Sequence, residues 1–158
     1  MKLRKKDPWK SAKEYSKDLS SLTINLLVKD ITLSKDFAEQ VLNARIVYHD
    51  ADFVAIEGYG SRWCLHAYHT YDTHPLMILI NQSKAKGVGV ELRLIGCDPN
   101  EAEKRAIENG FQILAKSADK PHGMRETYII DGDDYCWVPC IKLPTISSRP
   151  SLSYLFIL

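Results

Sequence analysis

The sequence has no run of apolar residues that approaches the roughly 20 needed to span a bilayer as a helix, so we expect no membrane partner. It also lacks a charge excess, because 21 lysines and arginines offset 20 aspartates and glutamates and leave a net charge of +1. Nothing therefore predicts a nucleic-acid partner. The cysteines show no CxxC spacing, and no cleavable apolar leader follows the first charges. We expect a cytoplasmic protein without disulfides.

The sequence does have enough apolar content, 45% of 158 residues, for one packed domain. A pattern of turn and cap residues repeats along the chain. An alternating strand is followed by Asp30, where the chain is expected to turn, and another by Asp98, which is expected to cap a helix; a helix stop follows at Asn43 and Gly110. The first unit is expected to contain strands 22–28, 45–49, 52–57 and 62–69, and the second strands 88–95, 111–116, 124–130 and 135–141. The chain is therefore predicted to be an α+β repeat of the unit βαβββ.

Two segments lie outside this repeat. Residues 1–20 are expected to form a basic arm and a short amphipathic helix over about 8–19, with Asp7 as its cap. Residues 21–142 form the repeated domain, with modules at about 22–70 and 88–142. Residues 143–158 form an apolar tail, for which packing on a sheet is the favoured interpretation.

Two stretches resemble known motifs. VKDITLSKDF at 28–37 is similar to the V-x-D-x-x-x-S-x-x-F opening of the vicinal oxygen chelate superfamily. KPHGMRETYIIDGDDYCWV at 120–138 resembles a segment of its bleomycin-resistance branch, P-W-G-x-R-E-F-x-x-x-D-P-D-G-x-x-W. Departures are Ala38 where Tyr is frequent, His122 where Trp is common, and DGDD in place of D-P-D-G. The resemblance covers about residues 22–141 and includes glyoxalase I and extradiol dioxygenases.

The resemblance implies that the modules form a curved, trough-like mixed sheet whose hollow holds a ligand or metal, and that the protein is a homodimer. Val90, Leu92 and Leu94 alternate with Glu91 and Arg93, so the charged face is expected to border the trough. The candidate ligand-binding residues are those expected on the trough face: Asn25, Cys64, His66, Tyr68, Glu91 and Arg93.

Metalloenzymes of the superfamily use four ligand positions, which by the resemblance correspond here to Thr23, Cys64, Glu91 and Val138. Only Glu91 is a good ligand for a hard divalent ion, and a zinc or iron centre needs about three protein ligands. We therefore expect no metal and no other cofactor. The alternative is one divalent ion that involves Glu91.

The resulting hypothesis is a metal-free protein that holds a small organic ligand in the trough, with no catalytic residue assigned. Glu91 and Arg93 can instead satisfy each other as an ion pair. A second hypothesis is an enzyme, either a metal-dependent lyase, isomerase or dioxygenase with an atypical ligand set, or a metal-free one that uses Glu91 and His66 as acid and base. A third is a structural module that acts through the N-terminal helix and the tail.

Overall fold

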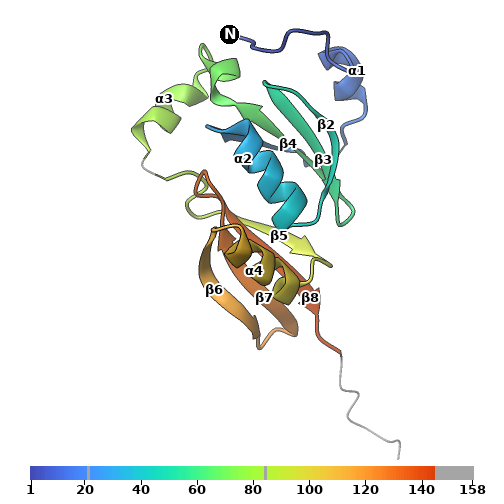
Figure 1. Cartoon of the computed structure of the whole chain (residues 1–158), viewed down its shortest axis with the longest axis vertical. Helices are drawn as coiled ribbons and strands as arrows, with labels where there is room; N and C mark the ends of the chain where they lie inside the picture. Colours follow the sequence, from blue (N-terminus) through green and yellow to red (C-terminus); the bar gives the residue numbers. More distant parts are fainter. Residues whose placement is uncertain (21, 84, 145–158) are drawn as a thin grey trace, which may run out of the picture.

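The computed structural model describes residues 1–20, 22–83 and 85–144, and it contains two four-stranded mixed sheets (Figure 1). Sheet 1 has the order β1-β4-β3-β2, and sheet 2 has the order β5-β8-β7-β6. The strands of sheet 1 are β1 Ile24–Val28, β2 Arg45–His49, β3 Phe53–Gly58 and β4 Ser61–Ala67. Those of sheet 2 are β5 Glu91–Ile95, β6 Gln112–Asp119, β7 Met124–Ile130 and β8 Cys136–Lys142.

The two sheets are built alike. In each, the first strand pairs in parallel with the last, and the remaining pairs are antiparallel. The predicted α+β fold of two βαβββ modules is confirmed, and neither sheet closes into a barrel. No helix in the described ranges has the length and apolar character needed to cross a bilayer.

Each module's helix begins at an aspartate: at Asp98, as predicted, and at Asp30, which was predicted only to turn the chain. Asp30 Oδ1 accepts hydrogen bonds from two backbone N–H groups at the start of α2 (Ile31–Asp36), which continues into the π-helical turn η1 (Phe37–Val41). Asp98 does the same for α4 (Pro99–Glu108). Asn43 and Gly110 follow these helices with φ of +54° and +75°, as expected for residues that end a helix.

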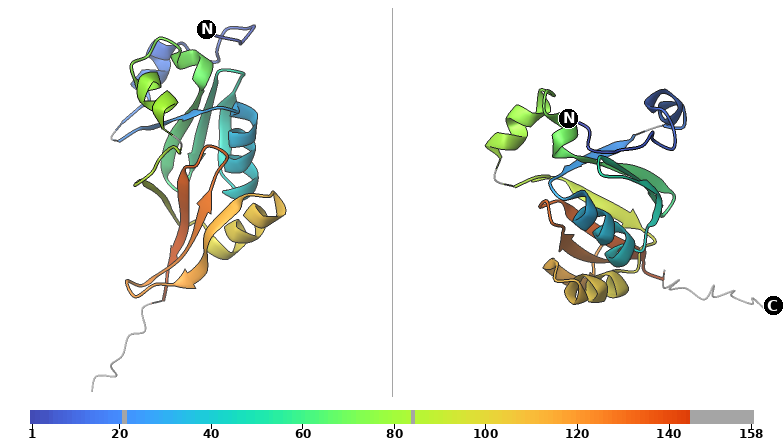
Figure 2. Two further views of the ribbon diagram at one scale, coloured as in Figure 1. Left: turned by 90° about the vertical axis from the view of Figure 1, so that its left-hand side faces the viewer. Right: turned by 45° about the horizontal axis from the view of Figure 1, so that its top comes forward.

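One core joins the modules. Helices α2 and α4 cover the same side of the two sheets, whereas α1 (Ala12–Lys17) and α3 (Leu76–Gln82) lie on the other side (Figure 2). The core residues come from both modules, and the rings of Trp63 and Trp137 lie 5.6 Å apart at its centre. Leu92 and Leu94 are buried in this core as predicted, but Val90 precedes β5 and is 53% exposed.

Three segments differ from the sequence prediction. The N-terminal helix begins at Ala12 because Ser11 and Glu14 form a capping box, in which each side chain accepts a hydrogen bond from the other's backbone N–H. Strand β4 ends at Ala67, and a 3-10 turn, η2 (Tyr68–Tyr71), follows it. The connector between modules contains α3, whose continuous apolar run LMILI has no helical periodicity. Of the predicted tail, residues 145–158 lie outside the described residues.

Candidate functional site

The N-terminal arm, residues 1–19, lies over the face of sheet 1 that is turned away from α2. Between arm and sheet is a cavity of about 460 Å³, which we call the arm cavity. Its floor comes from the strands and includes Asn25, Cys64 and His66. These three predicted site residues are brought together because Asn25 pairs with Cys64 and Leu27 with His66 in the parallel register of β1 and β4.

Aromatic side chains line the arm cavity on both sides. Trp9 of the arm stacks on Tyr48 of β2, with ring centroids 5.6 Å apart and planes 18° apart. Tyr15 of α1 meets Phe53 of β3 edge-on at 5.4 Å. These contacts hold the arm on the sheet although no residue of α1 itself is buried.

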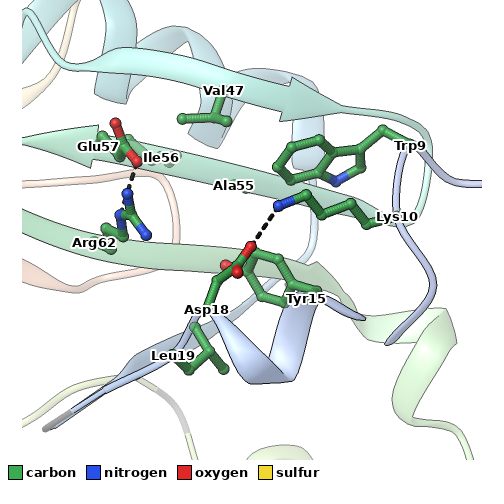
Figure 3. A pocket seen from close by; sticks show the side chains of 10 residues that line it. All are labelled: Trp9, Lys10, Tyr15, Asp18, Leu19, Val47, Ala55, Ile56, Glu57 and Arg62. Carbon is green, nitrogen blue, oxygen red and sulfur yellow. Dashed lines mark hydrogen bonds and ion pairs between the residues drawn. The ribbon is translucent and has the colours of Figure 1, made fainter. Parts of the chain in front are cut away.

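A smaller hollow of about 220 Å³ lies beside the arm cavity and shares Trp9, Lys10, Tyr15 and Leu19 with it (Figure 3). Two ion pairs cross this hollow: Lys10 with Asp18, and Arg62 Nε with Glu57 Oε1 at 2.7 Å. Because its charged groups are already paired, we do not treat the smaller hollow as the site.

A buried carboxylate fastens the arm to sheet 1. Asp52, only 2% exposed, accepts hydrogen bonds from the backbone N–H groups of Leu3 at 2.7 Å and Arg4 at 3.3 Å. His69 Nε2 lies 2.8 Å from Asp52 Oδ1. Burial acts to raise the pKa of Asp52, but the hydrogen bonds from His69, Leu3 and Arg4 hold it below its usual value. Asp52 is therefore ionised at neutral pH and already fully engaged.

The floor of the arm cavity is polar but uncharged at neutral pH. Burial lowers the pKa of His66, whose ring packs against Phe53 and Tyr71 at centroid distances of 4.9 and 5.3 Å. Burial also raises the pKa of the Cys64 thiol to about 11, and this thiol donates to the Asn25 side-chain oxygen. Cys64 is therefore a thiol rather than a reactive thiolate.

Tyr68 lies away from this group. Because β4 ends at Ala67 and not at the predicted residue 69, Tyr68 belongs to η2 and does not line the arm cavity. Burial raises the pKa of its phenol, and its hydroxyl has no hydrogen-bond partner within the described ranges. The Nζ of Lys86 lies 5.8 Å from the centre of the Tyr68 ring.

The remaining predicted site residues, Glu91 and Arg93, lie on sheet 2, on the face opposite the core as expected. Arg93 Nη1 donates to Glu91 Oε2 at 3.1 Å, which is the ion pair anticipated from their spacing. Arg93 also pairs with Glu126 of β7, a carboxylate that sequence reasoning missed and that is 0% exposed. Glu91 itself is about half exposed, so the charged face of β5 borders an open surface in the single chain.

Glu126 is the centre of a polar cluster on sheet 2. His122 Nε2 lies 2.8 Å from its Oε1, and the Tyr128 hydroxyl donates to its Oε2 at 3.0 Å. Burial acts to raise the pKa of Glu126, but hydrogen bonds from His122, Arg93 and Tyr128 hold it below its usual value. The alternation of Glu126 and Tyr128 in the predicted strand 124–130 was the available signal, since it places both on one face.

The residues present do not fit the metal centre of the superfamily. Within the described ranges, no three His, Cys, Asp or Glu side chains gather closely enough to hold a metal ion. At three of the four corresponding positions the side chain is unsuited to the metal: Val138 has no donor atom, the Cys64 thiol is protonated, and Glu91 is paired with Arg93. His66 and Glu91, the pair proposed for acid–base chemistry, lie on different sheets.

Comparison with known proteins places the chain by its fold. No family model and no curated protein matches the sequence. Among solved structures, a glyoxalase/bleomycin resistance protein/dioxygenase family enzyme from Burkholderia phytofirmans aligns with a TM-score of 0.62 and 17% identity over 77% of this chain and 97% of that one. A glyoxalase/bleomycin resistance protein/dioxygenase from Nocardioides aligns with a TM-score of 0.59 and 17% identity over 87% of this chain and 95% of that one. TioX from Micromonospora aligns with a TM-score of 0.56 and 18% identity over 78% of this chain and 99% of that one. The predicted resemblance is thus confirmed at the level of the fold.

Proposed function

We propose that this protein binds a small organic molecule in the arm cavity, without a metal ion. The observation that carries the proposal is the cavity itself: about 460 Å³ of space between the arm and sheet 1, walled by aromatic rings and floored by a few polar groups. Pockets for small ligands have this size and this mixture of surfaces. The fold supports the proposal, since it is shared with bleomycin-resistance proteins.

His66 supports the same proposal. Its ring faces the arm cavity, and neither a hydrogen bond nor a neighbouring charge accounts for its lowered pKa, which follows from burial alone. No residue of the described ranges forms a hydrogen bond with this ring, and its nitrogens remain open to the arm cavity. A ligand with a hydroxyl, amide or acid group can bond to them in place of water. His66 therefore serves as the polar anchor of the site.

The test is a thermal-shift screen of aromatic acids, organic cations and glycopeptides. A ligand at about 100 times its Kd stabilises the native state by about 2.7 kcal/mol, which for a chain of this size raises Tm by about 5 to 10 °C. We expect at least one compound to raise Tm by this amount, and we expect His66→Ala to weaken the binding of that compound by about tenfold. His49→Ala, the same change at an exposed position outside the arm cavity, is the control.

Two results count against the proposal. If no class of compound raises Tm, the arm cavity is a packing defect rather than a binding site, and a structural module is the better reading. If a compound binds but His66→Ala and His49→Ala affect it equally, its site lies elsewhere.

We also propose that the native protein is a homodimer in which a second copy covers sheet 2. The face of sheet 2 opposite the core bears Ile95, which is 57% exposed, next to the polar cluster around Glu126. The resemblance to the superfamily implies the dimer, and this open face of sheet 2 is a surface available to a second copy. Light scattering is expected to give twice the 18.0 kDa of the chain. A mass of one chain at micromolar concentration contradicts the dimer but not the arm cavity.

A further inference from the structure

The charges around the arm cavity indicate which ligands it accepts. The floor is uncharged at neutral pH, since His66 is neutral and the Cys64 thiol is protonated, and the Tyr15 phenol of the arm above it is protonated as well. A charged ligand group placed against this floor loses its hydration without gaining a counter-ion, which is costly. Any charge on the ligand must therefore lie at the mouth of the arm cavity, where the arm supplies its own charges.

Those charges are mainly positive. The arm contributes Lys2, Arg4 and Lys10 to the lining. Lys10 is paired with Asp18 (Figure 3), but Arg4 Nη1 reaches Asp50 only at 4.0 Å. Lys2 has no ion-pair partner among the residues that the structure describes.

The acidic side of the lining is already occupied. Asp52 is the acidic residue that lines the arm cavity, and its oxygens are engaged by His69 and by the backbone of Leu3 and Arg4. A ligand cation would have to compete with these hydrogen bonds. A ligand anion instead meets Lys2 and the loosely paired Arg4, two cations that can donate hydrogen bonds to a carboxylate.

The walls determine the shape of the ligand. Trp9 and Tyr48 stack nearly parallel, whereas Tyr15 and Phe53 meet edge-on, so flat ring faces and edges surround the space. Aromatic rings pack favourably in both arrangements. A flat, apolar ligand body matches these walls better than a branched or flexible one.

We propose that the arm cavity selects a planar aromatic carboxylate, with its rings against the wall formed by the stacked pair Trp9 and Tyr48 and by Phe53, and its acid group toward Lys2 and Arg4. This inference rests on the proposed function and specifies its ligand. The polar floor at His66 and Asn25 then accommodates a hydroxyl or amide on the far side of the ring system. The selectivity comes from the arm, because both cations belong to it.

Three probes of one shape test this inference: 2-naphthoate, 2-naphthalenemethanol and 2-naphthylmethylammonium, each titrated by calorimetry into the full-length protein. We expect 2-naphthoate to bind about tenfold more tightly than the ammonium compound, with the alcohol between them. Raising the salt concentration from 50 to 500 mM is expected to weaken the binding of 2-naphthoate and to leave the binding of the alcohol nearly unchanged.

Variants locate the source of the selectivity. The double substitution Lys2→Gln and Arg4→Gln is expected to remove the preference for 2-naphthoate while the alcohol binds as before, since Asp52 holds the backbone rather than the side chain of Arg4. Lys104→Gln with Lys116→Gln, an equal loss of charge in a separate surface hollow, is the control and should leave the preference intact.

The outcomes separate this inference from the proposed function. Equal or tighter binding of the ammonium probe, or a preference that survives Lys2→Gln with Arg4→Gln, overturns the aromatic-acid inference and leaves the binding site standing. Failure of all three probes, when another compound of the thermal-shift screen still binds through His66, has the same meaning. Failure of the probes and of the whole screen rejects the proposed function as well.

Discussion

Arg93 controls the charge state of a carboxylate that has no contact with water. Glu126 is 0% exposed and relies on Arg93, His122 and Tyr128 for its hydrogen bonds. Arg93→Met is expected to lower the free energy of unfolding at pH 7 by about 2 kcal/mol, because it removes the cation that pairs with a buried carboxylate and leaves one of its charge-assisted hydrogen bonds unmade. Urea denaturation measures this loss. Glu91→Gln removes a half-exposed partner of Arg93 and should cost less than about 0.5 kcal/mol.

The lowered pKa of Glu126 also predicts that the stability of the protein depends on pH. The folded-state pKa of Glu126 is lowered, so its contribution to stability is present above the ordinary glutamate pKa of about 4.3 and is lost as pH falls through the folded-state value. Without Arg93 that pKa is higher than in the wild type, so the variant loses less stability on acidification. The difference between wild type and Arg93→Met should therefore shrink from pH 7 to pH 4. A constant difference contradicts this account of Glu126.

Some of these residue positions could be predicted from the sequence. The alternation in 90–95 placed Glu91 and Arg93 opposite Leu92 and Leu94, because side-chain direction in a strand depends only on local geometry. Glu126, the partner of Arg93, could not be derived in this way, because the pair forms only through the spatial order of the strands β5, β8 and β7 in sheet 2. Likewise, the exact end of β4 could not be predicted. Because the strand ends at Ala67, Tyr68 is not on the trough face.

Among the elements, the N-terminal arm has the most consequence for function. Its attachment depends on Asp52, so Asp52→Asn is expected to increase amide hydrogen exchange at Leu3 and Arg4 by about tenfold, as charge-assisted hydrogen bonds become neutral ones. Two-dimensional NMR measures this exchange directly. Asp72→Asn, which removes the exposed partner of the terminal amine, is the control. Unchanged protection at both amides contradicts the role of Asp52.

The arm also responds to acid. Because the pKa of folded Asp52 is lowered, its hold on the arm is complete above the ordinary aspartate pKa of about 3.9 and is lost as pH falls through the lower folded value. Ligand binding in the arm cavity should therefore be insensitive to pH from 5 to 8 as far as Asp52 is concerned. Loss of the arm's protection is expected only in stronger acid.

The elements show where local signals suffice. Asp98 was recognised as a helix cap because a side chain and the next few N–H groups decide a cap, whereas the cap role of Asp30 was visible only through its matching position in the repeat. The position of the arm over sheet 1 was not predicted, because Trp9 and Tyr15 find Tyr48 and Phe53 through contacts between distant segments. The arm cavity, which exists only between these segments, was therefore beyond a strand-by-strand reading.

At the scale of the whole molecule, the two modules share one core and should unfold together. Phe37 of the first module is 1% exposed and contacts Phe111 and Trp137 of the second, with centroid distances of 4.8 and 6.0 Å. Phe37→Ala is expected to lower the free energy of unfolding by about 3 to 5 kcal/mol. It should also speed amide hydrogen exchange by global unfolding equally in β3 and β7. Unchanged protection of β7 would show that the modules are independent.

The repeat itself was visible in the sequence, because each βαβββ unit carries its own caps and turns. How the two units join was not, since Trp63 and Trp137 meet only after both have folded. The consequence for function is that the two trough faces differ. Sheet 1 is covered by the arm and encloses a cavity, whereas sheet 2 bears a satisfied polar cluster on an open face.

The most direct test of the proposed site is a two-dimensional amide NMR titration of the full-length protein with the compound that raises Tm most in the thermal-shift screen. Binding in the arm cavity predicts that the largest shift changes fall on Asn25, Cys64 and His66 of sheet 1 and on Trp9 and Tyr15 of the arm. Changes centred instead on Glu91, Arg93 and Glu126 of sheet 2, with the arm unaffected, would contradict it.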